Sequence, residues 1–235
     1  MTQAGFKSKK VAILQSNYIP WKGYFDLVNS VDEFVLYDDV QFTKNDWRNR
    51  NIIKTSQGLK WLTIPASHTK LGQLIRDTKI ADNRWARKHW AALSQNYSKS
   101  PFFNDYRELL ESLYLGCAME YLSEINFRFI VEINRLLGIA TPIRWSHEFD
   151  RVDGQTERLL SICKQCNATE YVSGPAAKDY FNLDLARQEN ITISWVDYSG
   201  YDEYAQLFPP FEHGVTVLDL LFNTGPQARV FMKSF

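Results

Sequence analysis

Residues 11–51 read VAILQSNYIPWKGYFDLVNSVDEFVLYDDVQFTKNDWRNRN, and this stretch decides the fold. It opens with a short apolar run at 11–14, continues through a helix-like piece at 21–29, and reaches a second apolar run at 34–37. This order predicts a strand, a loop, a helix and a second strand, and such a crossover makes the two strands parallel. Open parallel sheets bind ligands beyond the carboxyl ends of their strands. Because polar residues follow both apolar runs, we expect a binding site there.

The rest of the chain continues the alternation of strands and helices. Apolar patterns predict strands at 59–64, near 74–80, and at 143–146, 169–172 and 191–196, and helices over 83–97, 102–115, 119–137, 157–166, 176–189 and 215–222. Gly138 is expected to end the helix 119–137, and Thr156 to cap the helix 157–166. The pattern predicts an α/β fold, Rossmann-like, with a mainly parallel sheet flanked by helices. We expect a single domain over residues 10–235, after a disordered lead-in over 1–9.

Asn126 interrupts the apolar stripe of the predicted helix 119–137. At about 100° per residue it lies about 40° from Leu122, inside the stripe. A polar side chain in that position needs a partner, which is either a structural hydrogen bond or a ligand.

Composition excludes several classes of function. The chain has 235 residues, with 27 Lys and Arg against 27 Asp and Glu, so no general attraction to nucleic acid or to an anionic membrane is expected. No apolar run approaches the roughly 18 residues of a membrane span, and no signal peptide is expected. Cys163 and Cys166 have C-x-x-C spacing, but no second pair completes a zinc site, so we expect no metal centre and a reducing cytoplasm.

Two polar clusters within residues 11–51 supply most of the candidate site. The first follows the first predicted strand, and its substrate-binding candidates are Gln15, Asn17, Tyr18 and Trp21. A helix amino terminus here would favour phosphate, and the alternative is an aromatic lid over the sheet. The second follows the second predicted strand. Its candidates are Asp38 and Asp39 as catalytic groups, and Gln41, Lys44, Trp47, Arg48, Arg50 and Asn51 for substrate binding.

The second cluster predicts contacts to a nucleotide. If residues 44–51 are helical, Lys44, Arg48 and Asn51 share one face. Lysine and arginine at that spacing would suit a pyrophosphate, because arginine can bind it through two parallel hydrogen bonds. Trp47 or Phe42 could stack on a base or a sugar. The alternative interpretation is a solvated run of charge.

Two further clusters lie later in the chain. Ser173, Gly174 and Lys178 follow the predicted strand 169–172 and open a helix, which is the geometry of an anion site. The absence of G-x-S-x-G argues against Ser173 as a nucleophile. His213 is a candidate general base near neutral pH, or else a surface histidine, and Asp219 follows it on the last predicted helix.

These clusters resemble the WbqC-like protein family. The matching segments, such as DEFVLYDDVQFTKNDWRNRNIIK, cover residues 11–28, 32–54, 62–65, 156–180 and 217–225. Family members often carry His-Gln-Pro where Leu14, Gln15 and Ser16 stand, and often a serine near Thr216. The family is associated with gene clusters for O-antigen and other surface polysaccharides. The resemblance therefore implies a cytoplasmic pathway that uses nucleotide-activated sugars.

Three hypotheses follow. The first is a transferase that moves an acyl or aminoacyl group from a donor to the amine of a nucleotide-linked amino sugar. Here Lys44, Arg48 and Arg50 hold phosphates, and an aspartate or His213 takes the proton. The second is a nucleotidyltransferase, since the opening unit is similar to the HIGH superfamily, although Trp21-Lys-Gly-Tyr24 replaces its HxGH signature. The third is a non-catalytic protein that binds nucleotide sugars or acts as a scaffold.

Overall fold

The computed structural model describes residues 8–235, so most of the expected lead-in over residues 1–9 lies outside the described residues. The chain forms two compact units, each assembled from three separate segments. Unit 1 comprises the chain up to Gln15, Leu27–Tyr37 and Ala140–Ser199, and unit 2 comprises Ser16–Asp26, Asp38–Ile139 and Gly200–Phe235.

Unit 1 contains a five-stranded sheet with the order β5-β2-β1-β6-β7. Every neighbouring pair in this sheet is parallel. The strands are β1 (Lys10–Leu14), β2 (Glu33–Leu36), β5 (Ile143–Trp145), β6 (Glu170–Ser173) and β7 (Thr192–Trp195). The strands predicted at 11–14, 34–37 and 169–172 are confirmed as members of one parallel sheet, and the structure places them next to one another in it. Helix α1 (Lys22–Asn29) joins β1 to β2 as the crossover that the opening stretch predicted.

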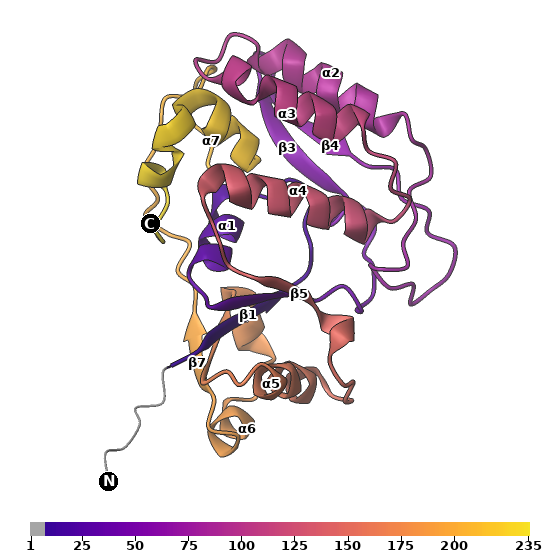
Figure 1. The fold of residues 1–235 in the computed structure, drawn as a ribbon, viewed down its shortest axis with the longest axis vertical. Coiled ribbons are helices and arrows are strands. Elements are labelled where there is room, and N and C mark those ends of the chain that lie inside the picture. The colour runs from indigo at the N-terminus through magenta and orange to yellow at the C-terminus, as the bar shows by residue number, and fades with distance from the viewer. Residues whose placement is uncertain (1–7) are drawn as a thin grey trace. The chain divides into compact units, whose positions relative to one another are not determined.

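Helices α5 (Gln155–Gln165) and α6 (Leu183–Gln188) lie on one face of this sheet (Figure 1). Leu159, Ile162 and Cys163 of α5 belong to one buried cluster with Val11 and Val35 of the sheet. Each fully buried aliphatic side chain of this kind contributes roughly 1.5–3 kcal/mol. The fold class is therefore α/β, with a parallel sheet flanked by helices.

Most of unit 2 is the long excursion of the chain between β2 and β5. It contains an antiparallel hairpin that is separate from the main sheet, with helices beside it (Figure 1). Its elements are β3 (Arg50–Thr55), β4 (Gly58–Thr63), α2 (Trp85–Tyr97), α3 (Phe103–Leu115), α4 (Leu122–Leu137) and, near the end of the chain, α7 (Val217–Thr224). The predicted helix 119–137 is confirmed from Leu122, and Gly138 ends it with a left-handed φ of 68°.

The conditional helix over residues 44–51 is wrong. Asn45 has a left-handed φ of 58°, the following residues form turns, and β3 begins at Arg50. Arg50 pairs with Thr63 and Asn51 pairs with Leu62, because the strand predicted at 59–64 closes a hairpin instead of joining the main sheet. Hence Lys44, Arg48 and Asn51 do not share a helical face.

Three smaller predictions also need correction. Thr156 lies inside α5, which Gly154 precedes, and its hydroxyl accepts a hydrogen bond from the backbone N–H of Asn182. The predicted helix 176–189 is divided into a 3-10 turn, Pro175–Asp179, and α6, because the Asn182 side chain caps a new helix start. Residues 74–80 form only isolated bridges, such as Gln41 with Leu74.

Within residues 8–235 no helix combines the length and the apolar composition needed to cross a membrane. No three His, Cys, Asp or Glu side chains of these residues gather where they could hold a metal ion. Cys163 and Cys166 are free and buried, and burial raises the pKa of both thiols, that of Cys166 to about 12.

A chain of buried polar groups crosses the aromatic core of unit 2. His89 Nε2 lies 3.2 Å from the Thr63 carbonyl oxygen, which can only accept, so this nitrogen donates. In the neutral ring Nδ1 then accepts from the Tyr18 hydroxyl at 2.8 Å, and that hydroxyl accepts from Tyr114 at 2.9 Å. Desolvation by burial lowers the pKa of His89 to about 4. The ring is therefore a neutral part of the core.

We expect acid to weaken the fold through His89. In the unfolded chain His89 binds a proton near pH 6.5, whereas in the folded chain it does so only near pH 4. The free energy of unfolding therefore falls as the pH drops from about 6.5 to about 4. The loss is on the order of 3 kcal/mol by pH 4. His89→Gln should lack this component. Urea denaturation of both proteins between pH 4 and pH 7 measures it, and parallel pH profiles would contradict the assignment.

Candidate functional site

The site is organised by the carboxylate of Asp38, which follows β2. Asp38 is 1% exposed. One of its oxygens accepts the backbone N–H of Ser16 at 2.8 Å, and the other accepts the hydroxyl of Ser123 from the first turn of α4. Burial raises the pKa of Asp38, while these hydrogen bonds and the charge of Arg48 oppose that rise. The segment that begins at Asp38 is thereby joined to the loop that begins at Ser16.

Asn126 and Asn51 then attach this loop, residues 16–20, to the segment 46–51. The Asn126 amide donates to Ser16 Oγ at 3.0 Å and to the Arg48 carbonyl at 2.8 Å. The Asn51 amide donates to the carbonyls of Tyr18 and Ile19, at 3.0 and 2.9 Å. The structural partner expected for Asn126 is thus present. These bonds bring together the two predicted clusters of residues 11–51.

Ile19 is the strained point of the loop. Its φ is 37°, a conformation that costs a β-branched residue about 1–3 kcal/mol. Its carbonyl accepts from Asn51 and also from the Thr216 hydroxyl at 2.7 Å, and its side chain is fully buried. The surrounding contacts therefore fix one backbone path for the loop.

Trp21, which directly precedes α1, packs against the segment that begins at Gly200. The indole of Trp21 covers Gly23, where a Cβ would lie 2.3 Å from a ring carbon, and its ring centroid is 5.5 Å from that of Tyr201. Lys22 is buried with its ammonium near the rings of Tyr201 and Tyr204, and burial lowers its pKa. Trp21-Lys-Gly-Tyr24, which stands where the HIGH superfamily has its HxGH signature, thus surrounds Lys22 with aromatic rings.

The segment 44–50 presents the exposed side of the site. Trp47 is 42% exposed. Its backbone N–H donates to the Asp46 carboxylate, and its carbonyl accepts the backbone N–H of Tyr18. Arg48 has a half-buried guanidinium 3.3 Å from Asp46. Arg50 lies over the ring of Trp61, 4.1 Å from its centroid. Two cationic groups and two indoles therefore lie on one fixed segment and its neighbouring strand.

The other candidates of the first two clusters differ in accessibility. Lys44 and Gln41 are exposed, and Asp39 is buried next to Asp38. Asn17 is half-buried, and its amide oxygen accepts no hydrogen bond from the described residues. Gln15 is the last residue of its segment of unit 1. Phe42 is buried against the His68 ring, so it cannot stack on a ligand.

A second buried carboxylate orders the segment that carries His213. Asp219 of α7 accepts the hydroxyls of Tyr97 and Tyr204, each at 2.8 Å, and the amide of Gln206 at 3.0 Å. Burial raises the pKa of Asp219. The Gln206 side chain also donates to the Glu212 carbonyl and accepts the Glu212 backbone N–H. His213 itself is exposed, with its ring 4.5 Å from that of Phe211.

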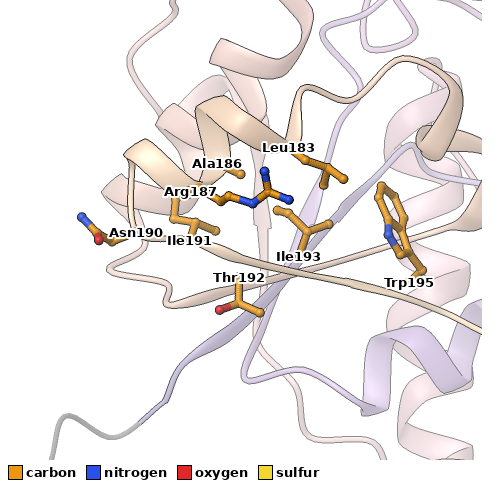
Figure 2. Close-up of a pocket in the computed structure, with 8 residues that line it drawn as sticks. All are labelled: Leu183, Ala186, Arg187, Asn190, Ile191, Thr192, Ile193 and Trp195. Carbon is orange, nitrogen blue, oxygen red and sulfur yellow. The ribbon is translucent and has the colours of Figure 1, made fainter.

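The third predicted cluster belongs to unit 1. Ser173 is buried and donates to the Tyr171 hydroxyl, while Gly174 precedes a 3-10 turn that is too short for a strong helix dipole. Lys178 is exposed, with its ammonium 5.8 Å from the ring centroid of Trp195. Trp195 closes one end of a groove between α6 and β7, and Arg187 lies at the same groove (Figure 2).

Ser123 and Trp61 were missed by sequence reasoning. Ser123 sits in the first turn of α4 and carries no signal beyond its polarity. Trp61 shares one face of the predicted strand with Leu59 and Thr63, so that face could be identified from the sequence, but its exposure could not.

The fold and the site define an α/β protein with a polar site after two adjacent parallel strands. The chain belongs to the WbqC-like protein family, whose model matches residues 15–230. It is 48% identical over 226 residues to an uncharacterized protein of Mycobacterium tuberculosis, Rv1507c, covering 96% of this chain and 98% of the relative. No solved structure matches the sequence.

We expect Asn126→Ala to destabilise the protein by roughly 2 kcal/mol, because two buried acceptors lose their donor. Asn134→Ala on the same helix is the matched control. Asn134 is also enclosed, and its amide oxygen, like that of Asn126, has no partner among the described residues. The Asn134 side chain does not bridge two segments as the Asn126 nitrogen does, so the loss should be smaller. Urea denaturation compares the two, and equal losses would show that the Asn126 bonds are not the cause.

Proposed function

We propose that the protein is an enzyme of surface polysaccharide biosynthesis that transfers an acyl or aminoacyl group to the amine of a nucleotide-linked amino sugar. One observation carries this proposal. The loop 16–20 and the segment 46–51 are fixed to each other beside two arginines and an exposed tryptophan. Membership of the WbqC-like family supports the pathway, because the family resemblance implies nucleotide-activated sugars.

Arg48 and Arg50 are the phosphate-binding candidates. Arg48 is partly buried, and its backbone carbonyl is held by Asn126, so its side chain starts from a fixed position. Arg50 has no carboxylate partner among residues 8–235. Each charge-assisted hydrogen bond to phosphate contributes roughly 1.5–3 kcal/mol, and a planar guanidinium can form two in parallel. Lys44, exposed on the same segment, would add charge.

The chemistry requires an acceptor for one proton. The amine nitrogen attacks the carbonyl carbon of the donor, a C–N bond forms, and the bond from that carbon to the leaving oxygen or sulfur breaks. The amine proton passes to a base, and the leaving group keeps the electron pair. His213 is the accessible candidate for the base. Both oxygens of Asp38 already accept hydrogen bonds, so it positions the loop, with Asp39 beside it.

A second candidate function is binding of a nucleotide sugar without catalysis. The enclosure of both aspartates favours it, because a buried carboxylate cannot reach a substrate proton directly. Product formation separates the two. The protein is incubated with a UDP- or dTDP-linked amino sugar and an acyl or aminoacyl thioester, and mass spectrometry looks for the N-acylated sugar. Tight binding of the amino sugar with no product from any donor would favour the binding protein.

We expect Arg48→Lys to weaken binding of a UDP- or dTDP-amino sugar roughly tenfold, because the planar fork is lost while the charge is kept. Arg48→Ala should weaken it further, towards a hundredfold. Calorimetric titration gives the affinities. Arg84→Ala is the control, since Arg84 is an exposed arginine paired with Asp82 elsewhere in unit 2. Wild-type affinity in both Arg48 variants would mean that Arg48 has a structural role only.

A further inference from the structure

Trp47 and Trp61 form a pair of exposed indoles on unit 2. Their ring centroids are 5.4 Å apart with an interplanar angle of 39°, and Trp61 is 43% exposed. Aromatic side chains this exposed are uncommon on a protein surface unless they contact something. The pair joins two segments, because Trp47 precedes β3 and Trp61 lies on β4. Neither segment alone would provide this surface.

The hairpin register places a cation on the same surface. Arg50 pairs with Thr63, and Trp61 lies two residues before Thr63 on β4, so Arg50 and Trp61 are diagonal neighbours on one face. The Arg50 guanidinium is 4.1 Å from the Trp61 ring centroid. Its Nε is enclosed and has no acceptor among the described residues, and no carboxylate of those residues forms an ion pair with Arg50. Arg50 as a whole is only half-buried, so the indole pair borders a guanidinium charge that no described carboxylate compensates.

We propose that Trp47 and Trp61 are a stacking platform for the base of a nucleotide whose phosphates meet Arg50 and Arg48. This proposal rests on the proposed function and names the part of its substrate that the platform binds. An aromatic face beside an uncompensated guanidinium matches a nucleotide, which joins a flat base to a phosphate within one small molecule. A neutral sugar would use the indoles but leave the charge of Arg50 without a partner.

The backbone geometry favours a preformed platform. The Trp47 backbone is bonded on both sides, to Asp46 and to Tyr18, and Trp61 is held in the β4 ladder opposite Ile52. A ligand would therefore order few main-chain groups on binding, which lowers the entropic cost. Stacking reads the flat face of a base and not its edge, so the platform should accept different bases alike.

The test compares UDP with inorganic pyrophosphate, which carries the phosphates without a base. In calorimetric titrations, Trp61→Ala should weaken UDP binding roughly tenfold and leave pyrophosphate binding unchanged. Trp61→Phe should recover most of the loss, because it keeps an aromatic face. Leu59→Ala is the matched control, since Leu59 is 51% exposed and lies on the same face of β4. It should bind both probes as the wild type does, and UDP and CDP should bind alike.

Three results would overturn the platform: no binding of UDP by the wild type, unchanged UDP affinity in Trp61→Ala, or equal losses for UDP and pyrophosphate. The last result would mean that Trp61 only supports Arg50. Trp47→Ala repeats the test from the other segment if the first variant folds poorly. The outcome is separate from that of the proposed function. Base-dependent binding without acyl transfer would leave the platform standing, and acyl transfer with unchanged affinity in Trp61→Ala would remove only the platform.

Discussion

The enclosed carboxylate of Asp38 is the constraint on which the site depends. A charge removed from water is tolerated only when hydrogen bonds replace its hydration. The donors here are the Ser16 backbone and the Ser123 hydroxyl, so the loop that begins at Ser16 and the start of α4 must both meet Asp38. Once Ser16 is fixed, Asn126 can reach its hydroxyl and the Arg48 carbonyl together. One buried charge thereby sets the positions of three separate stretches of chain.

The site has a rigid inner layer and an accessible outer layer. The inner layer consists of polar side chains that form their hydrogen bonds within the protein. Two of them, Asn51 and Thr216, hold the strained backbone of Ile19 in place. The outer layer consists of Trp61 with Trp47 and Arg50 on its ring, and the two indoles leave much of their surface open. This division suits recognition, because groups that bind a ligand cost less entropy when their supports are already ordered.

Much of the fold could be predicted because it depends on local pattern. The first strand, the crossover helix and the second strand follow from apolar runs and their spacing, and Gly138 ends α4 as its conformational freedom suggests. The segment 44–51 could not be predicted in the same way. Spacing alone allowed a helix, but Asn51 pairs with Leu62 of β4 and is therefore part of a hairpin. Long-range pairing overrides local spacing because it supplies hydrogen bonds that a short isolated helix lacks.

The sequence by itself determined the α/β class, the parallel direction of the first two strands, and the two polar clusters that follow them. These properties need only the periodicity of side chains and the geometry of a crossover. Only the tertiary structure decided which side chains of the two clusters are buried and which are exposed. Tyr18, Asp38 and Asn51 are enclosed, whereas Trp47 keeps an open face and gains Trp61 as its neighbour. The physical reason is that burial and cross-strand contact depend on which segments pack together, and no single stretch of sequence contains both partners.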